Sequence, residues 1–128
     1  MIEIIKAPRN VAAFRASGEV TAEDYRTVLV PAVTKLADEI NEINFLFLID
    51  TELKNFTASA WMQDVLLGLK QIGKWNRAAI VTDNENAISF TDGFSYIVPG
   101  EFRGFSKNKF DEALHWVQTG DKNETKNL

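Results

Sequence analysis

Cysteine is absent from the 128-residue chain, and histidine occurs once, as His115. The lack of cysteine excludes disulfide bonds, a thiol nucleophile and cysteine-ligated metal sites. A zinc site has little to build on, because such sites draw mainly on cysteine and histidine. His115 falls off the apolar face of the last predicted helix, which indicates a surface histidine. The sequence therefore predicts neither a metal site nor catalysis by histidine.

Glycine-rich phosphate loops and clusters of basic residues are also missing. The seven glycines form neither a GxGxxG pattern nor a P-loop, and no GxSxG elbow occurs. The net charge is −4, and acidic residues accompany the two loose lysine pairs, Lys107/Lys109 and Lys122/Lys126. Nucleic-acid binding depends on clustered Lys and Arg. We therefore expect no cofactor and no nucleic-acid partner.

Long hydrophobic runs are lacking as well. The longest apolar run, Ile43–Ile49, contains Asn44 and is far shorter than the ~20 residues that cross a bilayer. The first residues lack the apolar stretch of a signal peptide. We expect a cytoplasmic protein without a transmembrane segment. The length predicts a single domain over residues 1–120, and the polar residues 121–128 are expected to form a disordered tail.

Two strands and a helix are predicted in the first third of the chain. Ile2–Lys6 and Val11–Val20 flank turn residues and are expected to pair as a hairpin. A helix should follow from an N-cap at Thr21 to about Ile40. Pro31 lies inside this helix and should either kink or break it. Apolar residues at helical spacing mark the core face: Tyr25, Leu29, Ala32, Val33, Leu36 and Ile40.

Strands and helices alternate in the rest of the chain. Buried strands are predicted at Ile43–Asp50 and Arg77–Asp83, and a short last strand at Glu101–Phe105. Helices are expected at about 57–72 and 86–98. A final helix, capped by Ser106 or Asn108, should bury Phe110, Ala113, Leu114 and Val117 and end at Gly120. The order β-β-α-β-α-β-α-β-α predicts an α/β fold with a mixed sheet, an N-terminal hairpin and helices packed on the sheet.

Two carboxylates follow buried strands, where open α/β sheets tend to bind ligands. Asp50 and Asp83, together with Glu101 and Arg103, are candidate ligand-binding residues. Asp50, Asp83 or Glu101 with Arg103 could alternatively act as acid–base groups. The alternative is structural, because an Asp after a strand often caps the next turn or helix. We expect the capping role to prevail at both positions.

A second candidate binding surface is suggested by aromatic residues and by apolar residues that fall outside the core faces of the predicted helices. Phe56 and Trp61 are candidate contacts for a ligand. Leu67, Ile88 and Tyr96 fall off the core faces of their predicted helices and are expected to form a partner or homodimer surface. Trp61, Met62, Leu66 and Leu67 together also raise the possibility of a small apolar ligand.

Several stretches resemble the SpoIIAA-like family of small bacterial proteins, which is related to the STAS and CRAL-TRIO folds. They are FRASGEVTAEDY at Phe14–Tyr25, PAV at Pro31–Val33, WNRAAIVTD at Trp75–Asp83, PGEFRGF at Pro99–Phe105 and EALHWV at Glu112–Val117. The resemblance covers about residues 2–118. It implies a STAS-like mixed sheet with helices packed on it.

The resemblance also implies two kinds of function. STAS-type antagonists of anti-sigma factors switch by phosphorylation of a serine soon after a strand-ending Asp. In this chain Asp50 is followed by Thr51, whereas Thr57 and Ser59 lie at the wrong spacing, so a phosphorylation switch is not expected. The CRAL-TRIO relatives bind lipids. The leading prediction is a non-enzymatic binding or regulatory module that acts through protein–protein contacts; the alternatives are an apolar-ligand carrier and a hydrolase-type enzyme.

Overall fold

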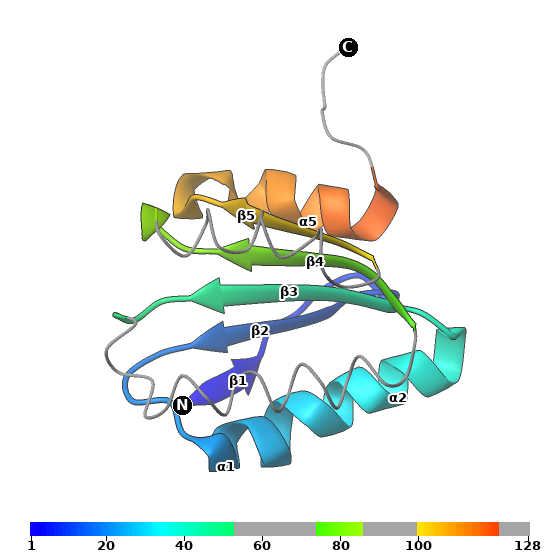
Figure 1. Cartoon of the computed structure of the whole chain (residues 1–128), viewed down its shortest axis with the longest axis horizontal. Helices are drawn as coiled ribbons and strands as arrows, with labels where there is room; N and C mark the ends of the chain where they lie inside the picture. Colours follow the sequence, from blue (N-terminus) through cyan, green and yellow to red (C-terminus); the bar gives the residue numbers. More distant parts are fainter. Residues whose placement is uncertain (53–73, 86–99, 121–128) are drawn as a thin grey trace.

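The computed structural model describes residues 1–52, 74–85 and 100–120. They form a five-stranded sheet in the order β1-β2-β3-β4-β5, with helices on its faces (Figure 1). The mixed α/β sheet predicted from the sequence is confirmed. The helices expected at about 57–72 and 86–98, and the tail at 121–128, lie outside the described residues. Among the described helices, none has the length and apolar character to cross a membrane.

The predicted N-terminal hairpin is present. β1 (Ile2–Ile4) pairs antiparallel with β2 (Ala12–Ala16), and Glu3 lies opposite Arg15. Both strands are shorter than expected. The backbone bond from the Val11 N–H to the Pro8 carbonyl, at 3.0 Å, closes the turn between them.

The later strands are parallel, as predicted. β2 pairs with β3 (Ile43–Ile49), β3 with β4 (Trp75–Val81), and β4 with β5 (Glu101–Phe105). β4 begins and ends two residues earlier than expected. Its first residue, Trp75, stacks against Phe45 and Phe102 in the core, so packing extends the strand at its start. Asp83 therefore lies in the loop beyond the strand.

The first predicted helix is continuous and contains a π-helical turn before Pro31. α1 (Ala22–Asp24) begins after the predicted N-cap, Thr21, which forms a capping box with Asp24. A five-residue π turn, η1 (Tyr25–Leu29), leads into α2 (Val30–Ile40). Val30 donates its N–H to the Tyr25 carbonyl across the wider turn. Because Pro31 falls at the start of α2, its missing N–H does not break the helix.

The α2 face of the sheet carries the larger core. Tyr25, Leu29 and Val33 pack against Phe14 and Phe47. The helical pattern predicted this face with one error. Ile40, expected inside, is 39% exposed, because it lies in the last turn and Ala37 occupies the buried position one turn earlier.

The opposite face is covered by α5 (Phe110–Thr119), which follows a 3₁₀ turn, η3 (Lys107–Lys109). Ser106 precedes this turn without a capping bond from its side chain, so the predicted caps at Ser106 and Asn108 are replaced by the 3₁₀ turn. Trp116 is fully buried against Phe105, a core position that the helical pattern missed. Gly120 ends the helix in the left-handed region, as predicted.

Polar contacts fix the amino end of the sheet to α5. Arg77 on β4 donates from Nε to the Val117 carbonyl at 2.9 Å and from Nη2 to that of Gln118 at 3.3 Å. The fully buried Asn44 accepts from Asn76 at 2.8 Å and donates to the Asn10 carbonyl at 2.9 Å. These bonds satisfy the last carbonyls of α5 and a polar group inside the sheet.

Substitution of Gly100 tests the fit between β4 and the turn before β5. Gly100 has φ +89°, and a Cβ there would lie 2.8 Å from the Trp75 carbonyl oxygen. Gly18 has φ +58° with open space around it. We expect Gly18→Ala to cost about 1 kcal/mol of unfolding free energy from backbone strain alone. Gly100→Ala should cost at least about 2 kcal/mol, because steric overlap adds to the strain. Urea denaturation of both variants measures the difference, and equal losses would contradict the close approach.

Candidate functional site

The carboxyl ends of the parallel strands meet at one edge of the sheet, where open α/β sheets commonly bind ligands. Four loops leave this edge: Ser17–Thr21 after β2, Asp50–Glu52 after β3, Thr82–Glu85 after β4, and Ser106 with η3 after β5. Both carboxylates singled out from the sequence lie here. The structure shows that they have different surroundings.

Asp50 is held between two cations from different parts of the chain. Its Oδ2 accepts from Nε and Nη2 of Arg15 at 3.0 and 2.6 Å, and its Oδ1 accepts from Nζ of Lys107 at 2.9 Å. Arg15 lies on β2 and Lys107 follows β5. Both carboxylate oxygens are thus engaged by charge-assisted bonds.

Arg15 extends this contact to the first strand. Its Nη1 donates to Oε2 of Glu3 on β1 at 2.8 Å. We call the series Glu3, Arg15, Asp50 and Lys107 the charge chain. Its side chains are 37–44% exposed, so water and salt screen the individual pairs. Two acids and two bases alternate in it, and its net charge is zero.

The charge chain fixes the ionisation of its central groups. Hydrogen bonds from Lys107 and then from Arg15 lower the pKa of Asp50 below the ordinary aspartate value of 3.8. The bonds from Arg15 to Asp50 and Glu3 raise the pKa of the guanidinium in turn. A carboxylate held in its charged form is a poor proton donor or acceptor near neutral pH. Asp50 is therefore suited to bridging cations.

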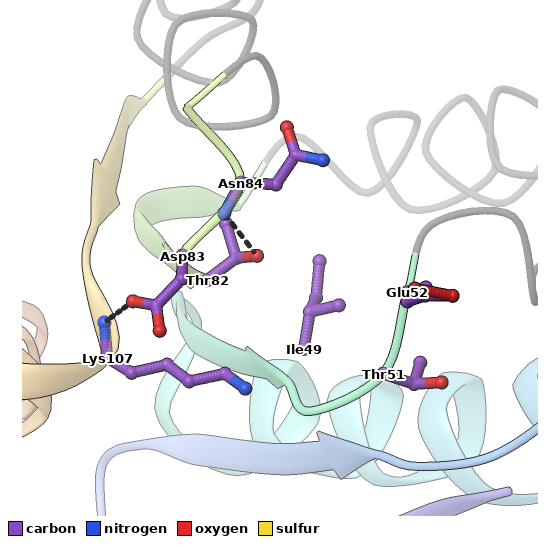
Figure 2. A pocket seen from close by; sticks show the side chains of 7 residues that line it. All are labelled: Ile49, Thr51, Glu52, Thr82, Asp83, Asn84 and Lys107. Atoms are coloured by element: carbon purple, nitrogen blue, oxygen red, sulfur yellow. Dashed lines mark hydrogen bonds between the residues drawn. The ribbon is translucent and has the colours of Figure 1, made fainter.

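Asp83 makes a different contact across the same edge. Its Oδ1 accepts the backbone N–H of Lys107 at 2.9 Å (Figure 2). We expected Asp83 to cap the helix that follows it, but that helix lies outside the described residues, and the contact described at the Asp83 side chain reaches the start of η3. Beside it, the Oγ1 of the buried Thr82 accepts the N–H of Asn84 at 3.2 Å. Lys107 thus binds Asp83 through its backbone and Asp50 through its side chain.

An open cleft of about 390 Å³ lies between these loops. Figure 2 shows the Lys107 and Asp83 side chains on one side, Thr51 and Glu52 on the other, and Ile49 between them. The Thr51 hydroxyl donates to the Gly18 carbonyl at 3.0 Å, which ties this wall to the loop after β2. Asp50 does not line the cleft. The two strand-end carboxylates therefore do not face one space as an acid–base pair. Among the residues that the structure describes, the cleft is lined by Ile49, Thr51, Glu52, Thr82, Asp83, Asn84 and Lys107.

Glu101 and Arg103 lie away from this cleft. Glu101 is exposed at the start of β5, opposite Arg77, and so at the amino end of the parallel strands. The guanidinium of Arg103 stacks on Phe105 and Trp116, at 4.8 and 5.2 Å from their ring centroids. The structure therefore does not bring this pair together with Asp50 or Asp83. Arg103 instead covers the aromatic core under α5.

The remaining predicted site residues lie outside the described residues. They are Phe56, Thr57, Ser59, Trp61, Leu67, Ile88 and Tyr96. Within residues 1–52, 74–85 and 100–120, no three acidic or histidine side chains converge in a way that would hold a metal ion.

Sequence reasoning missed Arg15 and Lys107 as members of the site. Arg15 counted only as the polar member of an alternating strand, and Lys107 only as half of a loose lysine pair. The position of Lys107 was an available signal, because it follows the predicted strand Glu101–Phe105, whereas Arg15 lies in the middle of the predicted strand Val11–Val20 and gave no such signal. Their common partner, Asp50, depends on the strand order.

Comparison with known proteins supports one family. The model of the SpoIIAA-like family matches residues 11–118. Among solved structures, the chain is similar to an uncharacterised protein from Shewanella loihica PV-4, of the DUF3478 family with a SpoIIAA-like fold. The two are 29% identical with a TM-score of 0.64, and the match covers 91% of this chain and 92% of that one. No curated protein matches the chain.

The pH dependence of stability tests the bridging role of Asp50. Because its folded pKa lies below the ordinary aspartate value of 3.8, Asp50 contributes stability that is present above about pH 4. That contribution is lost as the pH falls through the folded pKa. Asp50→Asn should lower the unfolding free energy at pH 7 and reduce the loss between about pH 4 and pH 2. Urea denaturation across this pH range measures both effects.

Asp38→Asn, on the exposed side of α2, is the matched control. Its unfolding free energy should fall between about pH 4 and pH 2 by nearly the same amount as that of the unaltered chain. Identical profiles for Asp50→Asn and Asp38→Asn would show that the charge chain contributes nothing to folding.

Proposed function

We propose that this chain, which belongs to the SpoIIAA-like family, is a non-enzymatic binding module. In this proposal it acts in the cytoplasm and engages a protein partner through the cleft at the carboxyl ends of β3, β4 and β5. The observation that carries the proposal is the double neutralisation of Asp50 by Arg15 and Lys107. Because the charge of Asp50 is neutralised, the groups that line the cleft beside it are suited to binding a partner.

Charge at the cleft favours a basic segment of the partner. Two acidic residues, Glu52 and Asp83, line the cleft. Lys107 is the basic residue of the described lining, and its ammonium group is bound to Asp50. Excess negative charge in a concave site attracts cations. Ile49 supplies an apolar floor, and Thr51 and Asn84 add hydrogen-bonding groups. This combination fits a short Lys- or Arg-containing segment that lies across the strand ends.

The lowered pKa of Asp50 supports binding over acid–base chemistry. An enzyme that used Asp50 with Asp83 would need one carboxyl to hold a proton near neutral pH. The pKa of Asp50 is lowered, both of its oxygens are engaged by Arg15 and Lys107, and Asp50 is not among the described residues that line the cleft.

An apolar ligand is a weaker candidate for this cleft. The residues that suggested it, among them Trp61 and Leu67, lie outside the described residues. The lining that the structure describes is mostly polar or charged, whereas pockets for apolar ligands are lined mainly by hydrophobic and aromatic side chains.

A peptide titration followed by NMR tests the proposal. The probe is a short peptide with two arginines and one lysine, and glutamates replace them in the matched peptide. We expect the basic peptide to shift the amide signals of Thr51, Glu52, Asp83, Asn84 and Lys107, because these residues line the cleft. The acidic peptide should leave these signals unchanged.

Two variants with the same change in charge separate the cleft from the general surface. Asp83→Asn retains an acceptor for the Lys107 N–H but removes the charge, and it should weaken binding by about threefold to fivefold. Asp38→Asn, on α2, should leave the affinity unchanged. Equal responses to both peptides, or equal affinities of both variants, would refute the proposal.

A further inference from the structure

β1 is an edge strand of the sheet, paired with β2 on one side (Figure 1). An edge strand presents a row of backbone N–H and C=O groups that can pair with another chain. The direction of these groups in β1 follows from its bonds with β2.

The backbone groups of β1 alternate between β2 and the open edge. Ile5 donates its N–H to the Ala13 carbonyl at 3.0 Å, and the Met1 carbonyl accepts from Ser17 at 2.9 Å. With Glu3 opposite Arg15, the odd-numbered residues therefore form the hydrogen-bonded pairs with β2. Ile2, Ile4 and Lys6 consequently direct their N–H and C=O groups outward.

The middle residue of this row also carries an exposed apolar side chain. Ile4 is 64% exposed, although its neighbour on the same face, Ile2, is only 3% exposed. Ile4 lines a groove of about 420 Å³ on the α2 face, together with Phe14, Ala32 and Leu36. An exposed isoleucine beside a row of outward-directed backbone groups favours pairing of this edge strand with a strand of another chain.

We propose that β1 pairs antiparallel with β1 of a second copy of this chain, about a two-fold axis through Ile4. The two sheets then form one continuous sheet, and the α2 faces of both copies lie on the same side. Ile4 of each copy lies against that of the other, above the two adjoining grooves. The interface lies on β1, whereas the cleft lies at the ends of β3, β4 and β5, so the inference does not depend on the proposed function.

The residue at the two-fold axis sets the register of the two β1 strands. With Glu3, Ile4 or Ile5 at the axis, the outward-directed backbone groups of one strand face those of the other. Side-chain charge and the position of Pro8 favour Ile4. Centring on Glu3 would place two like charges directly opposite, which destabilises a strand pair. Centring on Ile5 would place Ile2 opposite Pro8, which has no N–H to donate. Centring on Ile4 pairs Ile4 with Ile4 and Ile2 with Lys6, so all three residues that direct groups outward find a partner.

Opposite charges introduced at position 4 test this register. Ile4→Lys and Ile4→Glu should each abolish the Ile4 contact and place like charges opposite, which raises the dissociation constant of the dimer about tenfold or more. An equimolar mixture of the two variants should restore dimers, because Lys then lies opposite Glu. Sedimentation equilibrium gives the association constants, and native mass spectrometry identifies the mixed dimer by its mass.

Ile40→Lys is the matched control, because Ile40 is an exposed isoleucine in the last turn of α2 that does not line the groove beside Ile4. It should dimerise as the unaltered chain does. Circular dichroism confirms that each variant is folded. The proposal is overturned if the unaltered chain stays monomeric at all concentrations, if Ile4→Lys dimerises normally, or if the mixture forms no mixed dimer.

Discussion

The contact of Asp50 with Arg15 and Lys107 connects more of this molecule than any other side-chain contact described. Arg15 belongs to β2, Asp50 follows β3, and Lys107 follows β5. The bond from Arg15 to Glu3 adds β1. One neutral series of charges thus spans the carboxyl end of the sheet. The cleft lies beside this series, and its shape depends on where Lys107 is held.

The two ends of the sheet are fixed by different chemistry. At the amino end, the fully buried Asn44 and the guanidinium of Arg77 satisfy backbone carbonyls and attach the last turn of α5. At the carboxyl end, the bonds are partly exposed and involve formal charges. Bonds from Asn44 and Arg77 to uncharged carbonyl groups are less sensitive to salt than partly exposed ion pairs, which salt screens directly. The amino end therefore has the character of a structural support, and the carboxyl end can respond to a charged ligand.

The sequence predicted the elements better than their ends. The hairpin, the cap at Thr21 and the stop at Gly120 are confirmed, because each depends on short-range chemistry. The parallel strands are confirmed as well, because strands joined by long connections favour parallel pairing. The start of β4 at Trp75 was missed, since aromatic contacts with Phe45 and Phe102 extend it. Trp116 was missed because the expected apolar face of the last helix was placed around Leu114 rather than Trp116. Pro31 could not be interpreted either, because a π turn adds a residue that no helical pattern contains.

The amino-acid sequence by itself determined the α/β class, the family resemblance and the placement of Asp50 and Asp83 near strand ends. These features depend on residue type and spacing along one segment. The tertiary structure decided what the two carboxylates contact. Asp50 meets Arg15 and Lys107 because β2 adjoins β3 and the chain returns beside β4 to form β5. Asp83 meets the backbone of Lys107 for the same reason. Contacts between residues so far apart in sequence depend on strand order, which local patterns leave open.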